Sequence, residues 1–104
     1  MSPFNTPQNV PLNPTTVYGI TKVYMENMGN YYNKKYGVDF RSLRYPGVIS
    51  PTEYESHGTT DYASEIFFGA FKNKEYKICL APERALPMVY LDDALDGTVY
   101  LFNS

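Results

Sequence analysis

Between residues 17 and 35, apolar side chains recur at three- and four-residue intervals, and a short β-prone run at residues 38–45 follows directly. The spacing predicts an amphipathic helix, and the second run, bounded by Gly37 and Pro46, predicts a strand. A helix followed by a strand is half of a βαβ unit, which implies a parallel sheet covered on both faces. The chain is therefore expected to be α/β.

The predicted first helix carries signals at both ends. Thr15 and Thr16 offer a hydroxyl cap, Lys34 and Lys35 complement the helix dipole near the end, and Gly37 supplies a left-handed stop. A broad apolar stripe on this helix predicts burial on two sides, chiefly by core packing. The stripe consists of Val17, Ile20, Tyr24, Met28 and Tyr31, widened by Met25 and Tyr32.

The remaining chain divides into further predicted elements. Residues 1–16, with four prolines, form an irregular surface loop, and residues 17–104 form the domain proper. A second helix ends near Asn73 and is capped by Thr59 or Thr60, with Asp61 in its first turn. Alternation at residues 76–80 predicts a strand, residues 82–87 a loop and residues 88–91 a short extended segment. A last helix follows, capped by Asp92.

Charge and composition exclude several partner classes. A formal charge of −2 and a pI near 5.2 leave no electrostatic footprint for nucleic acid or an anionic membrane surface. The sequence has no apolar run long enough to span a bilayer and no signal peptide, which predicts a soluble chain. The single cysteine, Cys79, excludes an internal disulfide and is too few for structural zinc, so a reducing compartment fits.

The pair Tyr18 and Lys22 is the strongest chemical candidate. A spacing of four residues places the phenol and the ammonium one turn apart on the same helix face. A nearby cation favours the ionised form of a phenol, so the pair is a candidate proton-transfer device. In a chain with 11 tyrosines the same spacing also arises from a surface tyrosine beside a solvated lysine, and both readings stay open here.

Other chemistry-bearing residues have simpler explanations. His57 lies in a polar loop without metal-ligand partners, and Cys79 alternates within a predicted strand as a packed small residue. Asp92 and Asp93 are adjacent at a helix start, where capping explains them better than a carboxylate pair. We expect no metal site. The seven glycines contain no G-x-G-x-x-G cluster, so the phosphate-binding turn of a dinucleotide site is absent from this sequence.

Four stretches, taken together and in order, carry a family resemblance. They are residues 18–22 (YGITK), 36–50 (YGVDFRSLRYPGVIS), 58–63 (GTTDYA) and 86–95 (LPMVYLDDAL). Their sequence resembles the extended short-chain dehydrogenase/reductases, and within them most closely the NAD-dependent L-threonine 3-dehydrogenases. The resemblance implies the C-terminal part of a Rossmann-like, doubly wound parallel sheet. The Pro-Gly at residues 46–47 favours the threonine dehydrogenases over sugar-nucleotide epimerases, which typically show a Phe-Asn-Val type sequence there.

The resemblance also implies roles for individual residues. Tyr18 would be the general base, and Lys22 would favour its ionised form and hold the nicotinamide ribose. The segment expected to lie against the nicotinamide of NAD comprises Tyr45, Pro46, Gly47, Val48 and Ile49. Thr59 and Thr60 would line the pocket for L-threonine. Met88 belongs to a Leu-Pro-Met stretch that resembles part of the substrate domain.

The resemblance covers only the second half of such an enzyme. The glycine-rich NAD turn and the catalytic Ser or Thr of the family have no counterpart in this sequence, so we expect the chain alone to be inactive and to bind NAD weakly or not at all. Two alternatives remain: a sugar-nucleotide epimerase or dehydratase of the same superfamily, or a non-catalytic remnant that dimerises. In the complete enzyme a homodimer through the helix of Tyr18 is expected, in the cytoplasm or the mitochondrial matrix.

Overall fold

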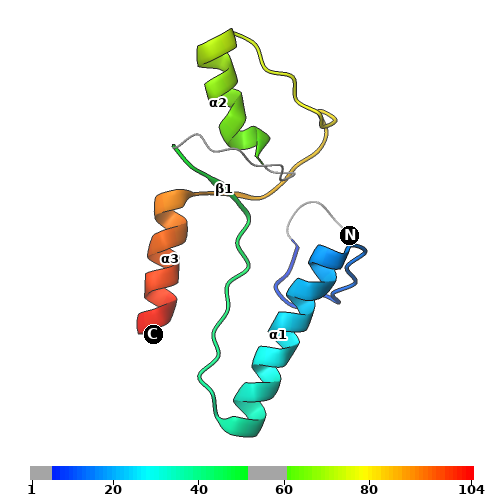
Figure 1. Ribbon diagram of the computed structural model, residues 1–104, viewed down its shortest axis with the longest axis vertical. Helices are drawn as coiled ribbons and strands as arrows, with labels where there is room; N and C mark the ends of the chain where they lie inside the picture. Colours follow the sequence, from blue (N-terminus) through cyan, green and yellow to red (C-terminus); the bar gives the residue numbers. More distant parts are fainter. Residues whose placement is uncertain (1–5, 52–60) are drawn as a thin grey trace. The chain divides into compact units, whose positions relative to one another are not determined.

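The computed structural model describes residues 6–51 and 61–104. These residues form two compact units, which divide between Leu43 and Arg44. The first unit contains helix α1 (Val17–Tyr36). The second contains strand β1 (Gly47–Ile49), helix α2 (Tyr62–Asn73), strand β2 (Met88–Tyr90) and helix α3 (Leu91–Asn103). Figure 1 labels β1 and the three helices. The fold is therefore α/β, as the sequence predicts.

Helix α1 begins and ends where the sequence predicts. The Thr16 hydroxyl accepts a hydrogen bond from the Gly19 N–H at 3.1 Å and so satisfies one of the free amides at the helix start. At the other end Gly37 adopts a left-handed conformation with φ 68°, and its N–H donates to the Asn33 carbonyl. Lys34 and Lys35 occupy the last turn, where they complement the helix dipole.

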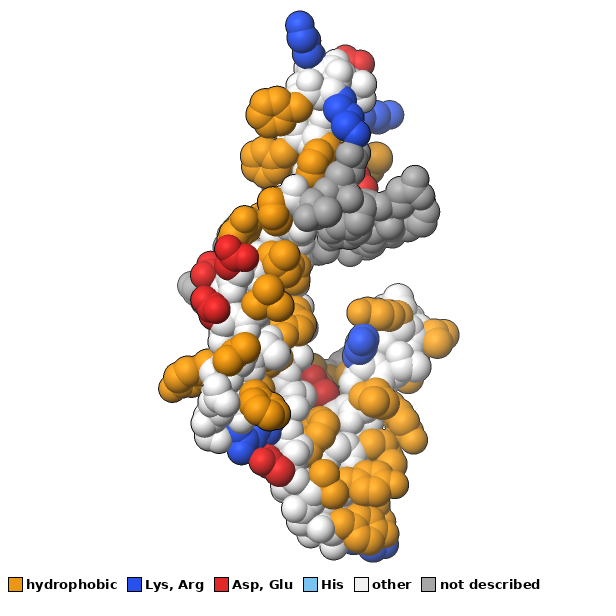
Figure 2. All heavy atoms as spheres, turned by 60° about the vertical axis from the view of Figure 1, so that its left-hand side comes forward, with side chains coloured by type: hydrophobic (Ala, Val, Ile, Leu, Met, Phe, Trp, Pro, Cys, Tyr) orange, Lys and Arg blue, Asp and Glu red, His pale blue; other side chains and the backbone are white. Residues whose placement is uncertain are grey.

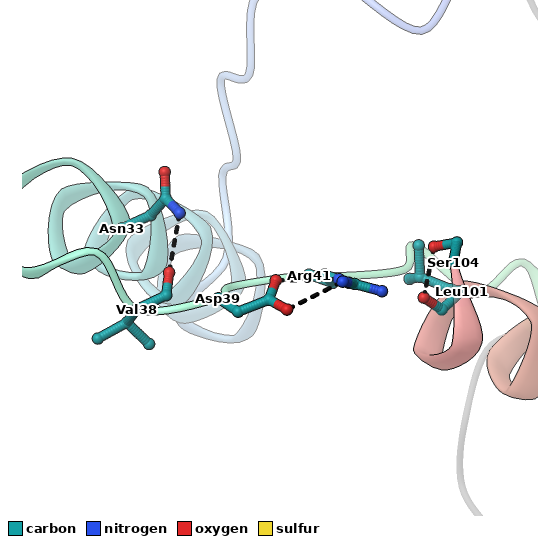
Figure 3. Close-up of polar contacts among 6 residues, drawn as sticks. All are labelled: Asn33, Val38, Asp39, Arg41, Leu101 and Ser104. Atoms are coloured by element: carbon teal, nitrogen blue, oxygen red, sulfur yellow. Dashed lines mark hydrogen bonds and ion pairs between the residues drawn. The ribbon is translucent and has the colours of Figure 1, made fainter.

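The predicted strand at residues 38–45 is wrong. The chain turns at Gly37 and packs against α1 instead: the ring of Phe40 occupies the space that a side chain at Gly29 would need. Asn33 Nδ2 donates to the Val38 carbonyl at 2.8 Å, and Arg41 forms a two-point ion pair with Asp39 (Figure 3). Within the described residues no strand pairs with this segment, and β-prone residues form a strand only beside a partner.

The apolar stripe of α1 is largely uncovered. None of the helix residues is buried, whereas the sequence predicts burial on two sides. Large hydrophobic side chains are widely exposed on the molecule, and Figure 2 shows them on the viewed face in orange. Those of α1 that are exposed are Val17, Tyr18, Ile20, Tyr24, Met25, Tyr31, Tyr32 and Tyr36. The amphipathic pattern specifies a face to be covered, but the cover is not supplied by the described residues of this unit.

The second unit is built on a two-stranded parallel sheet. β1 pairs with β2 in the register Gly47 to Met88, Val48 to Val89 and Ile49 to Tyr90, and the Gly47 N–H donates to the Pro87 carbonyl at 3.1 Å. The extended segment predicted at residues 88–91 is confirmed as β2 for Met88–Tyr90, whereas Leu91 begins α3. Gly47–Ile49, which follow the run at residues 38–45 that was predicted as the strand, form a strand themselves because they pair with β2.

Helix α2 ends at Asn73, as predicted, but its start differs in detail. Asp61 precedes the helix, and its carbonyl accepts the N–H groups of Ser64 and Glu65, so Asp61 does not lie in the first turn. The predicted caps Thr59 and Thr60 lie outside the described residues. Lys74 closes the helix in a left-handed conformation with φ 59°.

The strand predicted at residues 76–80 is also wrong. The segment contacts helix α2 through the side chain of Tyr76 instead of pairing with a strand. Tyr76 packs over Gly69 so closely that a Cβ there would lie 2.8 Å from its ring. Its hydroxyl donates to Glu65 Oε2 at 2.5 Å. No strand forms between residues 74 and 87 of the described chain, which shows that an alternating pattern is not sufficient without a neighbouring strand.

Helix α3 starts one residue earlier than its predicted cap. Tyr90 holds the N-cap position without a side-chain hydrogen bond, and both Asp92 and Asp93 lie in the first turn. Carboxylates at that position still favour the helix through its dipole. The prediction that Asp92 caps the helix is therefore wrong, and both carboxylates lie in the first turn.

The contact between Tyr76 and Glu65 predicts a measurable pH response. The hydrogen bond to the carboxylate, with smaller effects of burial and charge, raises the pKa of Tyr76 from 10.0 to about 12. A raised pKa means that the folded chain favours the neutral phenol. The contact therefore contributes stability that is complete below about pH 10 and is lost as the pH rises towards about 12.

Ultraviolet difference titration of the chain against Tyr76→Phe checks this prediction. The tyrosine transition that the variant lacks should lie near pH 12, and Glu65→Gln should lower it towards 10.0. If the transition that the variant lacks lay near pH 10.0 in the unaltered chain, the hydrogen bond would be contradicted.

Candidate functional site

Tyr18 and Lys22 lie together on one face of α1. Lys22 Nζ is 5.2 Å from the centre of the Tyr18 ring, within the range of a cation–π contact. The Tyr18 side chain is 73% exposed, so its hydroxyl is open to a ligand. The predicted juxtaposition of phenol and ammonium is present, and the catalytic role itself stays a prediction.

The backbone around this pair is fixed by its sequence. Gly19 allows a close approach of the preceding loop, because a Cβ there would lie 2.9 Å from Pro14 Cβ and 3.3 Å from Thr16 Oγ1. The hydroxyl of Thr21 donates to the Tyr18 carbonyl at 2.7 Å. The Ile20 N–H donates to the Thr16 carbonyl at 2.9 Å. Tyr18 and Lys22 therefore stand on the first two turns of a well-capped helix, a rigid position for a proton-transfer pair.

In the second unit, Tyr45 lies two residues before β1 and is tied to α3. Its hydroxyl bonds to the Thr98 hydroxyl, which in turn donates to the Ala94 carbonyl at 2.8 Å. Since Thr98 has one proton and gives it to Ala94, the Tyr45 hydroxyl is the donor in the first bond. The Tyr45 hydroxyl is therefore engaged with Thr98, so the predicted contact of Tyr45 with the cofactor would involve its ring and not its hydroxyl.

The other predicted residues of this unit gather along the sheet. Gly47, Val48 and Ile49 form β1, and Met88 is paired directly with Gly47. Pro46 and the three strand residues are half-buried, as is Met88. The strand therefore brings the predicted nicotinamide segment and Met88 side by side, whereas Thr59 and Thr60 lie outside the described residues.

Two hydroxyl residues of this unit were not predicted from the sequence. The Ser64 hydroxyl accepts a hydrogen bond from the Ser50 N–H at the end of β1. The Thr98 hydroxyl bonds to the hydroxyl of Tyr45, which lies before the start of the same strand. Both stand among apolar neighbours on amphipathic helices. A small polar residue within an apolar stripe is the signal that could have indicated Ser64, because a buried hydroxyl needs a partner. Thr98 is exposed and carries no such signal.

Several alternatives receive no support from the described part of the chain. Cys79 is exposed, so its interpretation as a packed residue is wrong. Within residues 6–51 and 61–104, no group of three His, Cys, Asp or Glu side chains lies close enough together to hold a metal ion. No helix of the described residues is long and apolar enough to cross a membrane. His57 lies outside those residues. A surface hollow at the end of α2, lined by Asn73, Glu75, Tyr76 and Lys77, contains none of the predicted site residues.

Comparison with known proteins identifies the family. Residues 2–104 match the model of the NAD dependent epimerase/dehydratase family. The chain belongs to this family. The parallel strands and helices match part of its Rossmann-like NAD-binding fold, which confirms the fold class predicted from the sequence.

Individual relatives narrow the comparison. The chain is 50% identical over 99 residues to the mitochondrial L-threonine 3-dehydrogenase of Bos taurus, covering 94% of this chain and 26% of the relative. It superposes on the crystal structure of the L-threonine dehydrogenase of Phytophthora infestans with a TM-score of 0.90 and 51% identity, covering 94% of this chain and 32% of that one. A monomeric L-threonine 3-dehydrogenase from a metagenome is 47% identical with a TM-score of 0.89, covering 94% and 32%.

These relatives confirm the resemblance to L-threonine 3-dehydrogenases and set its extent. The chain spans about a quarter to a third of the length of the relatives it matches.

Proposed function

We propose that this chain carries the proton-transfer helix and the nicotinamide-side strand of an NAD-dependent L-threonine 3-dehydrogenase. The observation that carries the proposal is the exposed Tyr18 side chain with Lys22 one helical turn away. The sequence of the chain is 50% identical to the L-threonine 3-dehydrogenase of Bos taurus and 51% identical to that of Phytophthora infestans. The hydroxyl and the ammonium suit a nicotinamide ribose and an alcohol substrate, because they offer one donor–acceptor and one cation on the same face.

The proposed chemistry assigns a proton step to Tyr18. Its Oη, as phenolate, accepts the proton of the β-hydroxyl of L-threonine, and the β-carbon becomes a ketone, which gives 2-amino-3-oxobutanoate. Bound NAD supplies the acceptor for the hydride that leaves the same carbon. Lys22, one turn from Tyr18, binds the ribose hydroxyls through its ammonium. The proton taken by Tyr18 then passes to solvent, to which the side chain is open.

The remaining residues have positioning roles in this proposal. Tyr45, Pro46 and β1 lie against the nicotinamide, and Met88 beside Gly47 borders the substrate side. Thr59 and Thr60 bind the amino-acid head group of threonine through their hydroxyls. The compartment we propose is the cytoplasm or the mitochondrial matrix, the latter by analogy with the Bos taurus relative.

A hybrid enzyme tests the proposal. In it, the segment of the Phytophthora infestans dehydrogenase that aligns with this chain is replaced by the chain itself. The hybrid should form NADH from L-threonine, and it should not epimerise a nucleoside diphosphate hexose. Activity on the sugar nucleotide without threonine oxidation would favour the epimerase alternative. A folded, NAD-binding hybrid with neither activity would contradict the proposal.

A second proposal concerns α1 as a dimer surface. Its uncovered stripe, centred on Ile20 and Tyr24, is apolar enough to bury against a second copy. Light scattering of the hybrid should report a dimer. Ile20→Glu should shift it to a monomer, whereas Asn30→Glu, on another face of the helix, should not. A monomeric hybrid would exclude this interface, and the metagenome relative described as monomeric shows that such a state occurs among the relatives.

A further inference from the structure

Ser64 is the one polar side chain that is buried among the described residues, with 6% of its surface exposed. It stands in the first turn of α2, where its own N–H donates to the Asp61 carbonyl at 3.0 Å. Its hydroxyl oxygen does not cap its own helix. It accepts the backbone N–H of Ser50, fourteen residues earlier, at 3.2 Å.

Ser50 is the residue at which the chain leaves β1. The strand is only three residues long, and in the described part of the chain its one ladder partner is β2. So short a strand has few backbone hydrogen bonds to fix its path. The contact from Ser50 to Ser64 adds an anchor at the carboxyl end of the strand, the edge of a parallel sheet at which ligands bind.

The anchor joins elements that the backbone ladder does not join. α2 packs against β1, and the Ser64 hydroxyl adds a direct polar link between that helix and the end of the strand. A buried hydroxyl is retained where it satisfies a buried partner, here the Ser50 amide at the half-buried end of the strand. An alanine at position 64 would leave that amide without this acceptor.

We propose that Ser64 is a positioning residue of the dehydrogenase site. Its hydroxyl holds the carboxyl end of β1 against α2 and thereby fixes the position of Gly47–Ile49 beside the cofactor. This inference rests on the proposed function. It assigns Ser64 no contact with substrate or cofactor; its action passes through the Ser50 amide. Displacement of a positioning element by about 1 Å can cost on the order of 10²-fold in rate.

The test uses the hybrid enzyme with Ser64→Ala, Ser64→Thr and the control Ser104→Ala. The control removes a hydroxyl that also bonds to backbone, the Leu101 carbonyl at 2.7 Å, at the far end of α3 (Figure 3). Ser64→Ala should weaken NAD binding about threefold to tenfold, the worth of one hydrogen bond, and lower kcat for threonine about 10- to 100-fold. Ser64→Thr keeps the acceptor and should restore both, and the control should change neither.

Amide hydrogen exchange at Ser50 supplies a readout that does not depend on threonine. It should accelerate in Ser64→Ala and return to normal in Ser64→Thr. Faster exchange with unchanged NAD affinity and kcat would overturn the positioning role, and unchanged exchange would overturn the anchor itself. If the unaltered hybrid binds NAD but does not oxidise threonine, the proposed function fails, and the effect of Ser64→Ala on NAD affinity still decides this inference. A hybrid that does not bind NAD at all would overturn both.

Discussion

Tyr18→Phe in the hybrid enzyme is expected to lower kcat for L-threonine by about 10²-fold or more. The substitution removes the hydroxyl that would accept the substrate proton, and it keeps the aromatic ring. The ring matters because the Lys22 ammonium lies 5.2 Å from its centre, and that contact survives in phenylalanine. Helix α1 should be unaffected, since its cap at Thr16 and its stop at Gly37 involve no Tyr18 side-chain atom. The loss would thus report the proton acceptor alone.

Tyr100→Phe is the matched control for this prediction. Tyr100 is exposed on α3, and the same atom is deleted there, so kcat should stay within about threefold of the unaltered hybrid. Steady-state kinetics with threonine and NAD, together with circular dichroism to verify folding, provide the measurement. Near-normal turnover of the Tyr18 variant would exclude Tyr18 as the base.

The 104-residue chain by itself is expected to bind NAD only at millimolar concentrations or more weakly, and to produce no NADH from threonine. Most dinucleotide affinity in Rossmann-like folds comes from the pyrophosphate at a glycine-rich turn, and this sequence contains no such turn. The contacts offered by Tyr18 and Lys22 are worth roughly 0.5 to 1.5 kcal/mol each, or up to about 3 when charged, against an association cost of at least about 4 kcal/mol.

Isothermal titration of NAD into the purified chain, with the hybrid as the positive control, measures this directly. Light scattering of the same sample should show association, because β1 and β2 each expose an unpaired edge in the described chain and the apolar face of α1 is uncovered. A Kd in the low micromolar range would reveal a binding site that none of the residues discussed above provides.

Features determined by neighbours in sequence were predicted correctly. The start of α1 at Thr16, its end at Gly37, the end of α2 at Asn73 and the short strand β2 all follow from local chemistry: a hydroxyl cap, a left-handed glycine or a β-prone run between breakers. The pairing of Tyr18 with Lys22 belongs to the same class, because helical geometry alone brings residues four apart onto one face.

Features that need a distant partner were not predictable in the same way. Residues 38–45 and 76–80 both have strand-like sequences, yet neither is a strand, while Gly47–Ile49 is one. The difference lies in what each segment meets: Phe40 packs on Gly29, Tyr76 bonds to Glu65, and Gly47 faces Met88. Strand formation depends on hydrogen bonds to another segment, so propensity cannot decide among competing runs.

The sequence by itself therefore determined the helices, the α/β class, the Tyr18 and Lys22 pair and the family, since these rest on periodicity, caps and motif order. Only the tertiary structure decided which segment pairs with β2, that the Tyr45 hydroxyl is held by Thr98, and that Ser64 receives the Ser50 amide. The physical reason is the range of the interaction. Helical contacts join residues three or four apart, whereas these contacts join residues 14 to 53 apart, and the chain's path brings them together.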